Sequence, residues 1–149
     1  MAWSSFKIEL GTFVDALGAN ATLKAFCQAK LKKIHTVKKF LTKKDLINKQ
    51  KLPIIMVTLA GNTSTPEAGR LILRKYTFHL YCGFLNDNRE IGMDLAIELE
   101  EEIEKAVLTF ADDDDSLRVS FGGMVNDKGV AHPNYFFVKE VTIEKEQEI

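Results

Sequence analysis

The sequence has little cysteine and no long apolar run. Its two cysteines, Cys27 and Cys82, stand far apart in a chain of 149 residues. Two isolated cysteines do not make a disulfide framework and are more typical of buried, reduced thiols. No stretch approaches the roughly eighteen consecutive apolar residues of a membrane-spanning helix, and residues 1–7 lack the basic start and apolar core of a signal peptide. We therefore expect a cytosolic protein that has no membrane partner.

Metal-binding and phosphate-binding motifs are missing as well. The histidines His35, His79 and His132 have no His-x-x-x-His or Cys-x-x-Cys neighbours, which zinc sites usually show. The acidic run 112–115 lacks the alternating acids, central glycine and distant glutamate of a calcium loop, and no glycine-rich phosphate loop occurs. The sequence predicts no metal, no cofactor and no enzymatic activity. A cysteine and a histidine brought together by folding stay open as an alternative.

Length and composition are those of one globular domain. Hydrophobic residues make up 46% of the chain and charged residues 28%, so a full core can form without disulfides or metal. We expect a single domain over residues 1–149. It comprises a basic helical part (1–52), a sheet with a long helix (53–145) and a charged tail (146–149).

Apolar spacing predicts two helices at the start of the chain. Apolar residues recur every three or four positions over residues 4–17, and Gly18 stands where a helix would end. A second helix is expected to begin near Asn20 or Thr22. The lysine-rich stretch 30–51 is interpreted as a basic connector to which the pattern assigns no definite structure.

The next segment predicts a hairpin followed by a long helix. The apolar run 54–60 and the alternating run 70–84 are typical of antiparallel strands, joined by an exposed loop over 61–69. A helix follows over about 88–110, because apolar residues fall on one of its faces at helical period. Asp87 and Glu90 stand at the spacing of a capping box at its start.

The remaining segment predicts a second hairpin. Its strands are 117–121, ended by a Gly-Gly pair, and 135–144, in which Lys139 interrupts the alternation. Residues 125–134 are interpreted as a mobile loop. The predicted fold class is α+β, with about four strands in an antiparallel or mixed sheet (two hairpins) packed on a long amphipathic helix, preceded by the N-terminal helices.

Charge is divided unevenly along the chain. Residues 1–52 carry eleven lysines against three carboxylates, a net charge of +8, whereas the remainder carries nine basic and eighteen acidic residues, a net charge of −9. Unlike surfaces on one subunit suit a head-to-tail contact that closes into a ring. The residues that we expect to contact partners or neighbouring subunits are basic-connector lysines, polar loop residues and helix glutamates: Lys38, Lys39, Lys43, Lys44, Asn62, Thr63, Ser64, Glu98, Glu101, Asp127, Lys128 and His132.

Two other interpretations of the charged segments stay open. The lysines of residues 24–51 could bind a nucleic acid backbone, because neutralising phosphates releases counterions. This stretch contains no arginine and few aromatic residues, which argues against base-specific contacts. The acidic cluster 98–104 is read as a solvated helix face or a surface for a basic partner rather than as a pair of catalytic carboxylates.

The order of these segments and their residue patterns resemble those of the tail terminator and related neck proteins of tailed bacteriophages. The resemblance rests on the strand "KLPIIMVTLAG", the strand "GRLILRKYTFHLYCGF", the acidic helix after them and the terminal strand pair. The lysine-rich 30–51 stretch is longer and more basic than this family leads us to expect.

The resemblance implies a structural role in the virion. A tail terminator is a homo-oligomeric ring, usually a hexamer, that caps the tail tube, contacts the sheath where one exists, and offers a docking surface to the head connector or neck protein. It is assembled in the host cytoplasm, DNA passes through its lumen without specific binding, and it carries no catalytic residues. The alternatives are a small nucleic-acid-binding or adaptor domain and, with less support, an enzyme whose site is assembled in space.

Overall fold

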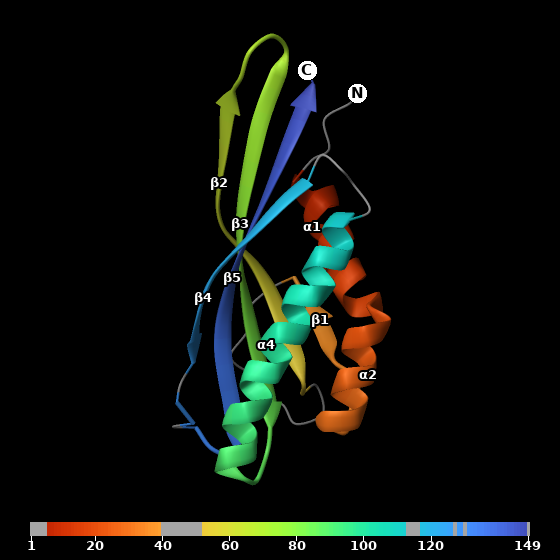
Figure 1. The fold of residues 1–149 in the computed structure, drawn as a ribbon, viewed down its shortest axis with the longest axis vertical. Coiled ribbons are helices and arrows are strands. Elements are labelled where there is room, and N and C mark those ends of the chain that lie inside the picture. Colours follow the sequence, from red (N-terminus) through yellow and green to blue (C-terminus); the bar gives the residue numbers. More distant parts are fainter. Residues whose placement is uncertain (1–5, 40–51, 113–116, 127, 130, 149) are drawn as a thin grey trace.

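The fold is α+β, with a five-stranded mixed sheet and a layer of helices on one of its faces (Figure 1). The computed structural model describes residues 6–39, 52–112, 117–126, 128–129 and 131–148. The elements in chain order are α1 (Phe6–Ala19), α2 (Ala21–Lys30), β1 (Thr36–Lys38), β2 (Ile54–Pro66), β3 (Leu71–Leu85), α4 (Arg89–Asp112), β4 (Leu117–Asn126) and β5 (Asn134–Glu148).

The strand order across the sheet is β1-β2-β3-β5-β4. Strands β2 and β3 form one antiparallel hairpin and β4 and β5 form the other, which confirms both predicted pairings. Strand β5 also pairs with β3 along its whole length, so the two hairpins join into one sheet. Strand β1 lies parallel to β2 at the edge. The prediction of about four strands missed β1, because three residues are too few to show a period of two.

The core lies between the sheet and the helices. Its centre includes Phe13 of α1, whose ring centroid lies 5.1 Å from that of Phe78 on β3 and 5.2 Å from that of Phe110 on α4. Leu99 and Ile103 of α4 are fully buried in the same cluster. The apolar stripe predicted for the long helix therefore faces the sheet, as its period requires.

The predicted loop over 61–69 is mostly strand. Strand β2 continues to Pro66 and β3 begins at Leu71, and the register runs from Asn62 opposite Tyr76 to Pro66 opposite Ile72. The Gly, Asn, Ser and Pro residues indicated turns, but backbone pairing with β3 overrides that preference. The two strands extend as an arm beyond the helical layer, together with the last part of β5 (Figure 1).

Two predicted strand ends are also wrong. Strand β4 passes through Gly122 and Gly123 to Asn126, and its register with β5 shifts there in a bulge. A bulge accommodates an extra residue without ending the strand. The predicted charged tail at 146–149 is strand as far as Glu148, because β5 follows β3 to the base of the arm's turn.

Helix boundaries differ from the predictions by a residue or so. Helix α1 includes Gly18 and ends at Ala19. Helix α2 begins at Ala21 after Asn20, whose side-chain oxygen accepts a hydrogen bond from the Leu23 amide at 2.9 Å. The cap of α4 is Asn88 rather than Asp87, because the Asn88 side chain accepts from the amides of Glu90 and Ile91.

Candidate assembly interface

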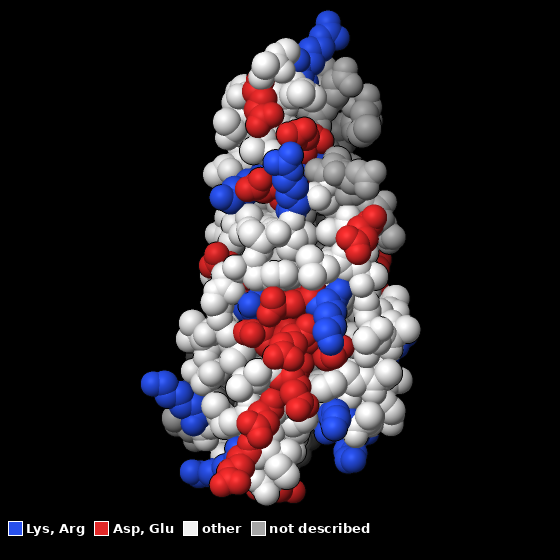
Figure 2. Space-filling view, in the orientation of Figure 1, with Lys and Arg blue, Asp and Glu red and all other residues white. Residues whose placement is uncertain are grey.

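The outer face of α4 combines carboxylates with uncovered apolar side chains. Asp94, Glu98 and Glu101 are exposed, and Figure 2 shows an acidic stripe running along this side of the molecule. Beside them, Ile97 and Leu108 are 49% and 45% exposed. The two apolar side chains lie about three turns apart on the same side of α4, so each adds a separate apolar group to the acidic stripe.

Lys139 of β5 neutralises two glutamates of α4 on the side of the helix that faces the sheet. Lys139 is 4% exposed, and its ammonium lies 3.7 Å from a Glu100 carboxylate oxygen and 3.6 Å from one of Glu104. It also donates a hydrogen bond to the Gly122 carbonyl at 2.9 Å. The prediction of a purely wet helix face is therefore wrong for these two glutamates.

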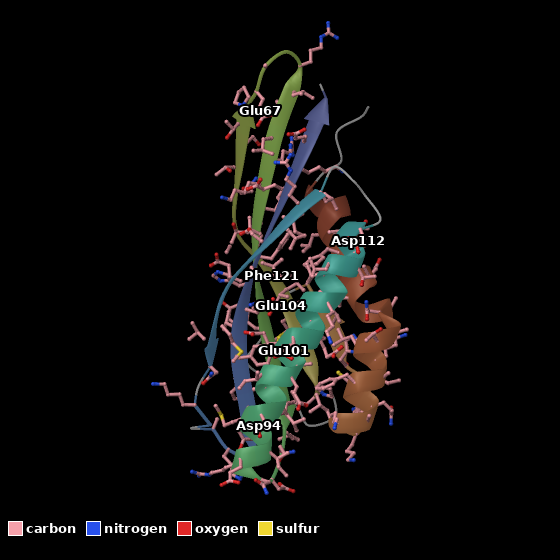
Figure 3. All side chains as sticks on the ribbon, viewed as in Figure 1. Glu67, Asp94, Glu101, Glu104, Asp112 and Phe121 are labelled. Atoms are coloured by element: carbon pink, nitrogen blue, oxygen red, sulfur yellow. The ribbon has the colours of Figure 1, made fainter. Side chains whose placement is uncertain are left out.

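The sequence pattern alone does not identify Lys139, because a charged residue at this position resembles a break in the alternation of β5. Its position keeps the alternation, because Tyr135, Phe137, Lys139 and Val141 are all buried on one side. Its ammonium also lies 5.3 Å from the centroid of the Phe121 ring, which Figure 3 shows next to Glu104 at the boundary between α4 and β4. A lysine at an inward-facing strand position is the signal that could have identified this group.

The described lysines of the N-terminal part divide into two sets. Lys24, Lys30, Lys32 and Lys33 are exposed on α2 and in the turn after it. Lys38 and Lys39 are half-buried, and the Lys39 ammonium lies 3.4 Å from the position that a Cβ on Gly11 would occupy, so its side chain follows α1. The other two lysines predicted to contact partners, Lys43 and Lys44, lie outside the described residues.

The polar segments predicted to make contacts are separated in space. Asn62, Thr63 and Ser64 are exposed on the arm. At the β4–β5 turn, Lys128 is exposed and has a positive φ of 58°. His132 is half-buried, and its Nδ1 lies 2.8 Å from the Tyr135 hydroxyl, an arrangement that holds the turn against the core. Asp127 lies outside the described residues.

The two thiols are not activated. Cys27 and Cys82 are buried and reduced; burial raises the pKa of Cys27 to about 12 and that of Cys82 well above its ordinary value. The His35 imidazole is directed elsewhere, because its Nε2 lies 2.8 Å from the Leu17 carbonyl, and burial lowers its pKa. The His35 backbone is hydrogen-bonded to the Cys27 thiol, and this bond lowers the pKa of Cys27 by less than burial raises it. Within the described ranges, no three metal-ligating side chains converge. These thiols have the surroundings of structural residues.

The sheet has two open edges, on opposite sides. Strand β4 pairs with β5 on one side, and no described strand pairs with its other side. Strand β2 pairs with β1 over Ile54–Met56, so its ten residues from Val57 to Pro66 have no partner strand on that side in the described part of the chain. Strand β4 is also ten residues long. Such edges offer unpaired backbone groups to another strand.

The end of β4 adds an apolar surface to its open edge. Val125 is 72% exposed and borders a hollow of about 260 Å³ on the sheet face opposite to the helices. Tyr81, Phe136 and Val138 line the same hollow. The β4 side of the molecule therefore has both an unpaired backbone and an apolar patch, which together favour burial in an assembly.

No known family model matches the chain, and no characterised protein sequence shows significant similarity to it. None of the described helices combines the length and the apolar character that a membrane span requires. A functional proposal therefore depends on the open edges of β2 and β4 and on the charged helices α2 and α4.

Proposed function

We propose that this protein is a structural subunit of a bacteriophage tail or neck, a tail terminator whose copies close into a ring, with a hexamer as the expected size. In this role it caps the tail tube and presents a docking surface to the head connector or neck protein, and it acts in the virion without catalysis. The observation that carries the proposal is the pair of open edges on opposite sides of one sheet.

Opposite edges support a head-to-tail contact. The outer edge of β4 in one copy can pair with the Val57–Pro66 edge of β2 in the next, and both stretches contain ten residues. Each copy then offers one donor edge and one acceptor edge, and the same contact repeats until rotation closes the ring. Pairing also removes the exposed edges that would otherwise promote irregular aggregation.

The arm supports a second contact, along the ring axis. The residues from Ala60 to Leu71 are all exposed, and the arm extends past the helices (Figure 1). A monomer gains little from a three-stranded arm whose residues from Ala60 to Leu71 are all exposed, because strands without a packed apolar face add little stability. In a terminator the arm can contact the tail tube below or the connector above.

The experiment is imaging and mass measurement with purified tail tubes. Negative-stain images should show rings at tube ends, and the solution mass should be that of a closed oligomer, six copies for the expected hexamer. Val125→Lys places a cation in the apolar patch beside the β4 edge, which the next copy would cover, and should abolish both signals. Thr77→Lys adds the same charge on the central strand β3 and should leave both intact. A protein that stays monomeric and leaves tube ends bare would overturn the proposal.

A further inference from the structure

The outer face of α4 is an unpartnered helix surface of mixed character. Ile97 and Leu108 lie beside the acidic residues Glu98 and Glu101, and no described element covers them. Carboxylates around apolar side chains fit a partner that brings cations and apolar groups together, since buried charge needs an opposite charge close by. The chain itself carries such a surface.

That surface lies on α2 and the turn that follows it. Lys24, Lys30 and Lys32 are exposed there, and Ile34 is 48% exposed at the end of the turn. The composition is the counterpart of the α4 face, with lysines in place of carboxylates and one large apolar side chain among them. Figure 2 shows basic side chains beside the lower part of the acidic stripe.

The two surfaces lie in one helical layer, where α2 packs against α4, but they are displaced toward opposite edges of the sheet (Figure 1). Helix α4 packs on β4 and β5, whereas α1 packs on β1, and α2 lies beyond α4 from the β4 edge (Figure 1). Helix α4 therefore lies nearer to the β4 edge of the sheet, and the lysines of α2 lie nearer to the β1–β2 edge. When the β4 edge of one copy approaches the β2 edge of the next, acidic and basic helices approach as well.

We infer that the outer face of α4, centred on Glu98, Glu101 and Ile97, docks against the lysine-bearing α2 and turn of the next copy of this chain. This inference rests on the proposed ring and names a second contact within it. The sheet edges supply backbone pairing, and the helical layer supplies charge complementarity. Opposite charge fixes which sides meet and accelerates their encounter, because potentials of opposite sign steer association.

The test is charge reversal with compensation. Glu98→Lys/Glu101→Lys should weaken self-association by at least about ten-fold in sedimentation velocity at low salt, since like charges then face each other. Mixing or combining it with Lys24→Glu/Lys30→Glu should restore association to within about three-fold of the original. The control Asp15→Lys/Asp112→Lys makes the same charge change at two exposed positions outside the arm, on α1 and at the far end of α4 from Glu98 (Figure 3 labels Asp112), and should leave helix docking intact.

The outcomes separate this contact from the ring itself. Reversal variants that associate as the original protein does, while Val125→Lys stays monomeric, would overturn the helix contact and keep the ring. A reversed pair that weakens association but gains nothing from the lysine variant would also overturn it. Circular dichroism and thermal unfolding establish that each variant folds, and Glu98→Gln/Glu101→Gln, which removes charge without reversing it, should give an intermediate loss.

Discussion

The ammonium of Lys139 donates its hydrogen bond to the carbonyl of Gly122, 2.9 Å away, at the point where β4 bulges against β5. A bulge interrupts the regular ladder of hydrogen bonds, and the buried lysine bonds to a carbonyl at that interruption. The same ammonium holds Glu100 and Glu104 of α4 through ion pairs. One side chain thus links helix, strand and bulge.

Removing the lysine and removing its carboxylates should have unequal effects. The Glu100 and Glu104 side chains are 18% and 31% exposed, so water can solvate them in Lys139→Met. In Glu100→Gln/Glu104→Gln the lysine, with a side chain 5% exposed, keeps its charge without an anion. We expect a loss below about 1.5 kcal/mol for the first variant and about 3 kcal/mol for the second. Urea unfolding measures both, and equal losses would contradict this assignment.

The two neighbouring glycines of the bulge should respond differently to alanine. A Cβ on Gly122 would lie 2.8 Å from the Glu140 Cβ, which cannot move without the β5 backbone. A Cβ on Gly123 meets nothing within 4 Å. Gly122→Ala should lower the free energy of unfolding by about 1–3 kcal/mol, and Gly123→Ala should change it by less than about 0.5 kcal/mol. Chemical unfolding curves that rank the two variants in the reverse order would exclude this packing.

His35 should make stability depend on pH. Burial lowers its pKa below the ordinary value of 6.5, so the unfolded chain binds the proton more readily than the folded one. Stability contributed by the neutral imidazole is complete above pH 6.5 and falls as pH drops from there toward the lowered pKa. His35→Gln should flatten the curve of unfolding free energy between pH 7.5 and 5. Parallel curves for the two proteins would contradict this effect.

The buried thiols should resist alkylation in the folded protein. Because burial raises the pKa of Cys27 to about 12 and also raises that of Cys82, little thiolate exists at pH 8 and reagents cannot reach it. Iodoacetamide should label both residues only after denaturation, as mass spectrometry would show. A variant with an added cysteine at the exposed position Ser64 serves as the control and should be labelled in the native state. Fast labelling of Cys27 without denaturant would indicate an activated thiol.

The elements best predicted from sequence are those whose burial is periodic. Helix α4 could be placed because its apolar residues repeat over 24 residues, and β3 because its buried positions alternate. The arm and β1 could not, because both are held by backbone pairing rather than by a side-chain pattern. The candidate interface could likewise not be predicted from a side-chain pattern alone. Exposed glutamates are visible in the sequence, but the side of the sheet to which each charged helix belongs depends on strand order.

The place of β5 in the sheet affects how the chain folds during synthesis. Strand β5 follows every other element in the sequence, yet it lies between β3 and β4 and pairs with both. While the ribosome is still translating residues before Asn134, the hairpin β2–β3 and helix α4 can form, but β4 has no strand to join and β3 keeps one side unpaired. A nascent chain at that stage exposes unpaired strand edges that promote aggregation, and β4 acquires its final geometry only when β5 has inserted.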